Sequence, residues 1–581
     1  MKTKDRQSLR TRLLVIMGGF AVFSGIIVAR LATIQVVHAG TLNQYAQSIH
    51  MHDISLPALR GDIVSANGTV LAMNVPRYQI VAAPRYVAHP RQEAQVLAHY
   101  LPFSVKTLQS VLHNDTWYAL LDRSVTPRVA HQIMQKNLVG IAAVPVTQVE
   151  YPNGTLASNV IGVVGSNGQG LSGIEYQYNK QLSGKAGHWL VAMDASGNPL
   201  PEWQKAYQAP QAGDTVQLTI NANIEQAAQK YLAWGIERAH ALDGTVIVEN
   251  PKTGAIIALA NWPDFNPNNY SNVTPLQMDD FAVQDPVPPG SIWKPVTATA
   301  ALTLGIFTPT SMFYTDGYKI VDGVRIDDWK PGGWGWITLT KGFEVSSDQV
   351  FMDVALKVGV KNLYHFIHLF GFDHPSGVGL PGDSSSIFIQ PSKVNPVDLA
   401  TMGFGQGLAV TAMQMTAADA AIINNGTMMQ PHILKEITAP NGRVVEKVKP
   451  IVESHPTTVK VAQEVQHMMV MEATQGTGVP AQVPGYIIGG KTGTAQKIIN
   501  GQTSSNLFVA SYMGAGPFPH PRFIMLVMIN RPVGKLFYGD QVSAPVWKKI
   551  ATYMFHYWGI KPYAGPVNGS KPGPIPGGTS N

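Results

Sequence analysis

A run of seventeen uncharged, mostly apolar residues near the amino terminus, Leu13–Ala29, constrains this chain more than any other feature. A helix needs about 20 apolar residues to cross a bilayer, and Leu31–Val37 extends the run because Arg30 can reach the interface with its long side chain. Five of the first twelve residues are Lys or Arg and one is Asp, a balance that predicts a cytoplasmic amino terminus. We expect a basic cytoplasmic tail at 1–12, an uncleaved transmembrane anchor at 13–37, and everything after it outside the cytoplasmic membrane.

A cleaved signal peptide is the alternative interpretation of the same segment. Val37-His38-Ala39 has the small-x-small pattern of a cleavage site. The apolar run is longer than the core of an ordinary signal peptide, and Arg30 lies between the run and that site, which favours the anchor. No other stretch of the sequence is apolar enough to span a bilayer, so we expect a single-pass protein.

Net charge and cysteine content exclude several classes of function. The net charge is +6, but the first twelve residues hold most of it, so no basic face for nucleic acid remains. The absence of cysteine excludes disulfides, thiolate zinc sites and a cysteine nucleophile. Charged residues make up only 13% of the chain, about half of the usual ~25%. We hypothesise that few carboxylates suit an acidic exterior, where their protonation would destabilise the fold.

Two regions of mixed α/β (α+β) class follow the anchor. Residues 38–235 contain β-type runs such as Tyr78–Ala82 and Val160–Val164, with Asn-Gly turn signals between such runs. A second organisation occupies 236–562, and the Pro/Gly-rich residues 563–581 are expected to be a disordered tail. The helices that we expect are 90–112, 126–137, 224–239, 291–304, 338–358, 360–369, 411–425 and 546–557. The strands that we expect in the second region are 246–248, 256–260, 507–513 and 523–529.

Ser291 and Lys294 form the most informative local pattern. A proline-stiffened loop ends at Gly290 and a helix is expected to start near Ser291, so that side chains three residues apart share one face. A lysine can take the proton of a serine hydroxyl if burial or a neighbouring cation suppresses its charge. The amino terminus of the helix would favour a developing oxyanion. An N-cap serine followed by a solvated lysine gives the same pattern, since S-x-x-K occurs by chance about once in a chain of this size.

Two later motifs, in a fixed order, favour the catalytic interpretation. Ser346-Ser347-Asp348 lies within an expected helix, and Lys491-Thr492-Gly493-Thr494 follows further along the chain. An earlier K-T-G copy, Lys252-Thr253-Gly254, is explained by a hairpin turn in which glycine takes positive φ. Gly485–Thr492 also matches the phosphate-binding pattern G-x-x-x-x-G-K-T, but Gly493 disfavours the helix that such a loop requires. We therefore expect a strand there, with Lys491 beside a site.

Together these motifs resemble those of the class B penicillin-binding proteins, the monofunctional D,D-transpeptidases that cross-link peptidoglycan. The resemblance covers almost the whole chain. It implies an elongated non-catalytic module at 38–235, followed by a serine transpeptidase domain at 236–562 with an antiparallel sheet flanked by helices. The flanking segments that carry the resemblance are Arg60–Ile63, Asn67-Gly68, Leu71-Ala72, Tyr151-Pro152, Gly162, Gly173–Glu175, Thr253–Ala258, Gly403–Gly407 and Asn425-Gly426.

The resemblance also implies a role for each motif residue. Ser291 would be the acylated nucleophile, Lys294 its general base, and Ser346 a proton relay to the leaving or incoming amine. Lys491 would help to keep Lys294 neutral. The residues that would bind the terminal carboxylate of the donor peptide are Thr492, Gly493 and Thr494, together with Lys491. Backbone N–H groups of Ser291 and Thr494 would form the oxyanion hole.

The implied reaction needs neither metal nor cofactor. A stem peptide would acylate the serine with release of D-alanine, and the amine of a second stem peptide would then form the cross-link. β-Lactams would stall as stable acyl-enzymes. The implied partners are a membrane glycosyltransferase and division or elongation proteins. A catalytically silent penicillin-binding scaffold or sensor, a D,D-carboxypeptidase and a β-lactamase are the alternatives.

Several residues depart from the family pattern. Asp348 stands where most members have Asn, and a carboxylate near Lys294 would oppose its role as a base; either Lys491 offsets this effect or Asp348 points away. Val149 replaces the usual Arg before the Tyr-Pro pair, and Ser65-Ala66 replaces the usual Asp-Arg. The surroundings of the later motifs resemble division or sporulation members, while Asp348 favours elongation.

An aromatic, glycine-rich loop precedes the second motif. Trp329, Trp334 and Trp336 alternate there with glycines. These side chains would either pack against the domain or form a wall of the substrate cleft, and the sequence leaves both open.

Overall fold

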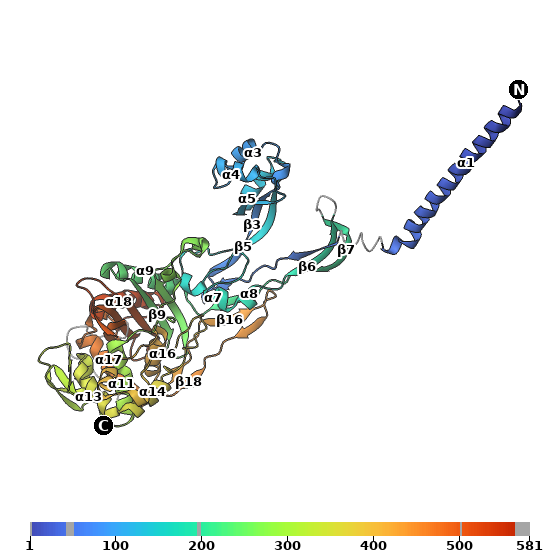
Figure 1. Ribbon diagram of the computed structural model, residues 1–581. Helices are drawn as coiled ribbons and strands as arrows, with labels where there is room; N and C mark the ends of the chain where they lie inside the picture. Colours follow the sequence, from blue (N-terminus) through green and yellow to red (C-terminus); the bar gives the residue numbers. More distant parts are fainter. Residues whose placement is uncertain (1–2, 42–50, 194–198, 500–501, 564–581) are drawn as a thin grey trace. The chain divides into compact units, whose positions relative to one another are not determined.

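The computed structural model describes residues 3–41, 51–193, 199–499 and 502–563 (Figure 1). The chain forms two compact units, one built from residues 1–59 with 184–212 and the other from the remaining residues. The expected disordered tail lies, apart from its first residue, outside the described residues. The expected division between the two modules, at residue 235, falls inside helix α9 (Ala222–Ala239) and stays a prediction.

The first unit contains the apolar amino-terminal helix and a small sheet. Helix α1 (Thr3–Ala32) continues into the π-helical turn η1 (Thr33–Val37). Within the described residues, Arg10–Val37 is the one helix long and apolar enough to cross a membrane, and no residue of its most apolar stretch is buried. The sheet is antiparallel in the order β1-β6-β7. Its strands are β1 (Met51–Leu56), β6 (Gly187–Met193) and β7 (Pro199–Gln208).

A five-stranded antiparallel sheet, ordered β10-β9-β21-β20-β19, organises the second unit (Figure 1). Every residue of β21 is buried, because alternate side chains enter two different cores. Phe523, Met525 and Val527 pack in one core, whereas Ile524 and Leu526 pack in the other. The strands are β9 (Asp243–Asn250), β10 (Ala255–Trp262), β19 (Gly489–Ile499), β20 (Gln502–Gly516) and β21 (Phe523–Asn530).

Helices cover both faces of this sheet, which confirms the expected architecture. Helices α9 and α18 (Gly539–Tyr557) share the first core with the sheet. The second core contains α11 (Lys294–Thr303), α16 (Ala412–Ile423) and α17 (Val459–Gln475). The shorter elements are η3 (Pro267–Asn272), α10 (Pro275–Met278), η4 (Gly290–Trp293), β11 (Met312–Thr315), β12 (Tyr318–Val321), β13 (Val324–Asp327), β14 (Gly335–Thr338), α12 (Leu339–Glu344), α13 (Asp348–Val358), α14 (Val360–Leu369), η5 (Pro391–Lys393), α15 (Pro396–Met402), β15 (Met428–Met429), β18 (Val452–Ser454) and η6 (Val479–Ala481).

A second large sheet of this unit has the order β17-β16-β8-β2-β3-β4, with β5 also paired to β3. The predicted strand at Tyr78–Ala82 is the end of β3, and the Asn-Gly pair at 67–68 forms the turn before β3, so both expectations are confirmed. The strands are β2 (Ile63–Val64), β3 (Val70–Ala82), β4 (Ala119–Val125), β5 (Ile141–Glu150), β8 (Thr215–Leu218), β16 (Leu434–Thr438) and β17 (Val444–Lys447). The helices are η2 (Pro84–Tyr86), α3 (Pro90–Leu97), α4 (Val105–Leu112), α5 (Pro127–Met134), α6 (Ser158–Ile161), α7 (Gly173–Gln177) and α8 (Asn179–Leu182).

Three secondary-structure expectations were wrong, and one helix was missed. The helix expected over 90–112 is two helices, α3 and α4, because residues 98–104 between them are not helical. Val160–Val164 is not a strand: its first residues end the short helix α6, and its apolar side chains are buried in the core, a pattern that periodicity alone cannot assign. The helix expected over 338–358 breaks between α12 and α13. Helix α17 was not expected at all, because Gln466 and Glu472 interrupt its buried apolar face.

A buried ion pair joins the segments that carry the family resemblance in the amino-terminal module. Arg60 Nε donates to Glu175 Oε2 at 2.7 Å, and Arg60 Nη2 donates to the Glu175 carbonyl at 2.8 Å. Tyr151 OH donates to the other carboxylate oxygen at 3.3 Å. Burial raises the pKa of Glu175, and Arg60 opposes that rise. Because removing either partner would leave a buried charge unpaired, these distant motif residues hold the module together.

Candidate active site

Ser291 lies in η4, which continues directly into α11, as the sequence predicts. Gly290 has a φ of +59° and donates its N–H to the Gly405 carbonyl at 3.0 Å. A Cβ on Gly405 would lie 2.2 Å from the Gly290 oxygen, so the two backbones need glycine to approach so closely. Ile292 and Trp293 are completely buried. Ser291 itself is half-buried and is therefore presented on a rigid turn.

Lys294 is completely buried and reaches the second motif. Its Nζ donates to the Ser346 carbonyl at 2.7 Å and to Ser346 Oγ at 3.3 Å. It also forms an ion pair with Asp348, Nζ to Oδ1, at 2.7 Å. Asp348 therefore points toward Lys294, which excludes the alternative that its side chain points away. Burial raises the pKa of Asp348, while the charge of Lys294 opposes that rise.

Ser346 lies in the break between α12 and α13, where its φ is +59°. Ser347 caps α13 through its Oγ and also donates to Asp328 Oδ2 at 2.6 Å. Asp328 Oδ2 accepts from the backbone N–H of Gln349 at 3.1 Å as well. These contacts compensate for the left-handed backbone at Ser346, which a non-glycine residue adopts only at a cost. They fix the Ser346 hydroxyl between two lysines.

Lys491 enters the same cluster from the edge strand β19. It is completely buried, and its Nζ donates to Ser346 Oγ at 2.9 Å. Burial lowers the pKa of Lys491 to about 8; Glu472 raises it and Lys294 lowers it further. Glu472 Oε1 lies 3.5 Å from the ammonium nitrogen.

Gly493 brings the third motif against the first. A Cβ at this position would lie 2.3 Å from Ser511 Oγ and 3.0 Å from Ile292, so only glycine allows β19 to pack against η4. Thr494 follows it, and its Oγ1 accepts the N–H of Gly539 at the start of α18, at 3.0 Å. The Thr494 side chain therefore anchors α18 and stands apart from the lysine cluster.

The cluster as a whole is a row of charged groups around one hydroxyl, with a lysine on each side of the hydroxyl and a carboxylate at each end. The order is Asp348, Lys294, Ser346, Lys491 and Glu472, with each lysine next to its own carboxylate. Within the described part of the chain, Ser291 Oγ has no hydrogen-bond partner, so the expected contact with Lys294 is not made in this state. Among the other predicted residues, Lys294, Ser346, Asp348 and Lys491 lie in one cluster, whereas the Thr494 side chain binds the start of α18.

The backbone decides how the earlier K-T-G copy and the phosphate-binding pattern are to be interpreted. Lys252-Thr253-Gly254 forms the turn between β9 and β10: the N–H groups of Thr253 and Gly254 donate to the Asn250 carbonyl, and Gly254 has a φ of +76°. The turn prediction is confirmed. Lys491 and Thr492 lie inside strand β19, without the helix that a phosphate-binding loop needs.

Three supporting residues were missed from the sequence. Asp328 holds the second motif, and Glu472 with Thr477 holds the third. The one available signal was a lone carboxylate in the apolar run Met468–Ala473, since an acidic side chain in such a run is buried only with partners. In the aromatic loop, Trp329 donates its Nε1–H to the Val345 carbonyl at 3.1 Å, which places it beside the second motif.

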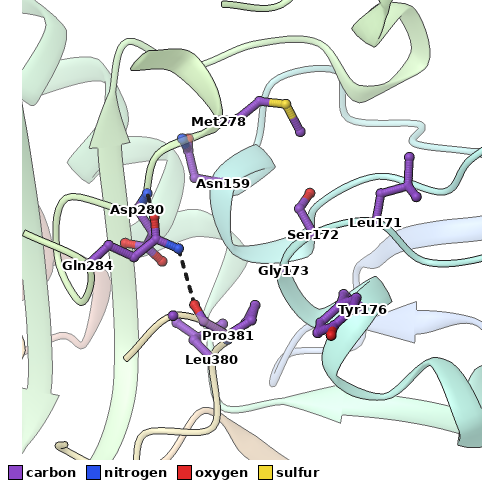
Figure 2. A pocket seen from close by; sticks show the side chains of 11 residues that line it. Asn159, Leu171, Ser172, Gly173, Tyr176, Met278, Asp280, Gln284, Leu380 and Pro381 are labelled. Atoms are coloured by element: carbon purple, nitrogen blue, oxygen red, sulfur yellow. Dashed lines mark hydrogen bonds between the residues drawn. The ribbon is translucent and has the colours of Figure 1, made fainter. Parts of the chain in front are cut away.

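A cavity of about 180 Å³ lies elsewhere in this unit (Figure 2). Asp280 is its one acidic residue, and the Gln284 amide donates across it to the Pro381 carbonyl at 3.2 Å. None of the predicted catalytic or substrate-binding residues lines it. The chemistry of the chain is therefore assigned to the lysine cluster. The other lining residues are Asn159, Leu171, Ser172, Gly173, Tyr176, Met278, Leu380 and Gly382.

Two family models match separate parts of this chain. The family model "Penicillin binding protein transpeptidase domain" matches residues 244–552, and "Penicillin-binding Protein dimerisation domain" matches residues 55–218. Stage V sporulation protein D of Bacillus subtilis is 31% identical over 96% of this chain and 87% of its own length. Peptidoglycan D,D-transpeptidase FtsI of Escherichia coli is 28% identical over 95% of this chain and 93% of its own.

Solved structures share the fold over most of the chain. A peptidoglycan synthetase from Bifidobacterium adolescentis aligns with a TM-score of 0.72 at 26% identity, covering 90% of this chain and 99% of that one. A penicillin binding protein 3 from Mycobacterium tuberculosis, complexed with aztreonam, aligns with a TM-score of 0.69 at 25% identity, covering 88% and 99%. With the transpeptidase model matching more than half of its residues, and a relative above 30% identity over nearly its full length, this chain belongs to the class B penicillin-binding proteins.

Proposed function

We propose that this chain is a peptidoglycan D,D-transpeptidase that forms its acyl-enzyme on Ser291. The observation that supports this most strongly is the position of the Ser346 hydroxyl, which accepts hydrogen bonds from both Lys294 and Lys491. Three motifs far apart in the sequence thus meet at one atom, beside the turn that presents Ser291. Such a cluster of nucleophile, amine and hydroxyl matches what acyl transfer requires.

In the first step Ser291 Oγ attacks the carbonyl carbon of the penultimate residue of a donor stem peptide. Lys294, as neutral amine, takes the hydroxyl proton. The tetrahedral oxyanion forms next to the N–H groups of Ser291 and Thr494. The C–N bond then breaks, and the leaving D-alanine receives a proton through Ser346. In the second step an amine of another stem peptide attacks the ester, a new amide forms, and the proton returns to Ser291 Oγ.

Both lone pairs of Ser346 Oγ are engaged by lysine donors, which directs its own proton away from them. That proton is the one available to a leaving amine. Lys491, with the hydroxyl and backbone groups of Thr492, Gly493 and Thr494, is proposed to hold the terminal carboxylate of the donor. A buried ammonium is suited to this because a carboxylate satisfies its charge.

The proposed setting is the outer face of the cytoplasmic membrane. The apolar segment Arg10–Val37 would cross it once, with the basic tail inside. There the enzyme would act with a membrane glycosyltransferase that supplies uncross-linked strands. A role in division or sporulation is favoured by the similarity to the sporulation protein and FtsI.

Labelling of the full chain with a fluorescent penicillin tests this proposal. Wild-type protein is expected to form a covalent adduct that survives denaturation, and Ser291→Ala is expected to form none. Incubation with two stem peptides should then yield a cross-linked dimer and free D-alanine. An adduct that persists in Ser291→Ala would refute the assignment of the nucleophile. Release of D-alanine without any dimer would identify a carboxypeptidase instead.

A further inference from the structure

Glu472 lies outside the three motifs but contacts the third one from helix α17. It is completely buried. Its Oε1 accepts hydrogen bonds from the Thr492 N–H at 2.9 Å, the Thr492 hydroxyl at 3.1 Å and the Thr477 hydroxyl at 2.8 Å. The same oxygen lies 3.5 Å from Lys491 Nζ. All of these contacts fall on Oε1, whereas Oε2 is buried without a hydrogen-bond partner in the described part of the chain. The neighbouring ammonium of Lys491 therefore compensates the charge of a carboxylate that is costly to bury.

The hydrogen bonds that Thr492 and Thr477 donate to Glu472 explain why Lys491 does not donate a hydrogen bond to this carboxylate. Lys491 directs its own hydrogen bonds to Ser346 Oγ at 2.9 Å and to the Thr492 carbonyl and hydroxyl at 3.2 and 3.3 Å. Glu472 therefore acts on the Lys491 ammonium through its charge, while Oε1, the oxygen nearest to that ammonium, already accepts hydrogen bonds from Thr492 and Thr477. A direct hydrogen bond would compete with the contact between Lys491 and Ser346.

We propose that Glu472 is a positioning residue for the reaction: its charge keeps Lys491 protonated, and Thr492 and Thr477 keep its oxygen from drawing that lysine away from Ser346. This inference rests on the proposed role of Lys491 in holding the donor carboxylate. Glu472 itself touches no reacting atom.

The charged groups around Lys491 come from several elements. Lys294 on α11 opposes its charge, and Asp348 on α13 supports it, but both act more weakly than Glu472 on α17. Tyr512 on β20 faces Glu472, and its own pKa is raised well above the usual value by burial and by that carboxylate. Because burial already lowers the pKa of Lys491 to about 8, removal of the Glu472 charge would lower it further.

Glu472→Gln separates charge from geometry, since the amide oxygen can still accept from Thr492 and Thr477. The measurement is the second-order rate constant for acylation of the full chain by a fluorescent penicillin, followed from pH 5.5 to 9. We expect the alkaline midpoint to move down by about one pH unit, which corresponds to acylation about fivefold slower at pH 8 and about tenfold slower at pH 9. At the acidic end the variant should approach the wild-type rate.

Thr477→Val is the matched control, because it keeps the carboxylate and removes one of its three donors. The freed lone pair then becomes available to Lys491, so the alkaline midpoint should stay or move up. A Glu472→Gln profile that is lowered equally at every pH would overturn the proposal, as would a downward shift in Thr477→Val. If Glu472→Gln does not fold, the direction of the Thr477→Val shift still decides. Wild-type protein without any Ser291-dependent adduct would instead refute the proposed function.

Discussion

Asp348 is the residue in which this site departs most from the pattern that its family shares. Its carboxylate lies 2.7 Å from Lys294 Nζ and is only 19% exposed. Proton abstraction from Ser291 needs the lone pair of Lys294 Nζ, and the ion pair holds that nitrogen against Asp348. The ion pair must therefore loosen before Lys294 can act as the base.

Asp348→Asn is expected to accelerate acylation at pH 7 by several-fold, because it removes the carboxylate that holds Lys294 Nζ in an ion pair. The thermal midpoint should fall at the same time, since a buried ammonium loses its carboxylate. Stopped-flow acylation by a fluorescent penicillin and a melting curve measure the two effects. Asp353→Asn is the control on the same helix, where the carboxylate pairs with Lys319 near the surface. A slower acylation in Asp348→Asn, with Asp353→Asn unchanged, would contradict this account.

At the scale of elements, the site depends on close backbone contacts between η4 and its neighbours. Gly405 packs onto Gly290, and Gly493 packs onto the first motif from β19. These contacts fix where Ser291 lies relative to both lysines. The position of the nucleophile is therefore sensitive to changes in glycines, which have no side chain to take part in the reaction.

Gly405→Ala tests this dependence. The added Cβ would lie 2.2 Å from the Gly290 oxygen, at a φ of +83°. Gly442 has the same φ with no atom within 4 Å of its Cβ, so Gly442→Ala reports the backbone penalty alone, about 1 to 2 kcal/mol. We expect Gly405→Ala to lose more stability than that and to slow acylation at least tenfold, by displacing the turn. Equal behaviour of the two variants, by melting and acylation assays, would show that the contact is unimportant.

The predictable part of the site is the part that short motifs encode. Ser291, Lys294 and Lys491 occur in ordered patterns, so a single sequence was sufficient to propose them. Glu472 could not be found in this way, because it becomes a neighbour of Lys491 only when α17 packs against β19. The break at Ser346 was missed for a similar reason: Asp328, distant in sequence, stabilises it.

At the scale of the whole molecule, the second unit buries carboxylates that serve no catalytic cluster. Burial raises the pKa of Glu249 to about 8 and that of Glu225 and Asp280 to about 7. A raised pKa means that the folded state binds protons more tightly than the unfolded chain. The proton-linked stabilisation of the folded state by these carboxyl groups is complete below their pKa in the unfolded chain, about 4. It is lost as the pH rises through their folded-state pKa values, about 7 to 8. This direction agrees with the hypothesis of an acidic exterior, which stays a prediction.

The free energy of unfolding should therefore decrease between pH 5 and pH 8, by up to about 1.4 kcal/mol per pH unit for each such group. Glu249→Gln should reduce this slope, because the amide has no proton to lose. Glu237→Gln, an exposed position on α9, should leave it unchanged. Circular dichroism melts at several pH values measure the slope. A wild-type protein that becomes more stable from pH 5 to pH 8 would contradict the expectation.

The lysine cluster and its two carboxylates also determine how the enzyme binds its substrate. Two ammonium groups stand against two carboxylates, so beyond a Debye length, about 8 Å at physiological ionic strength, their fields cancel. An anionic donor peptide would feel little attraction until it reached the site itself. The rate of productive encounters would then change little with the concentration of dissolved salt.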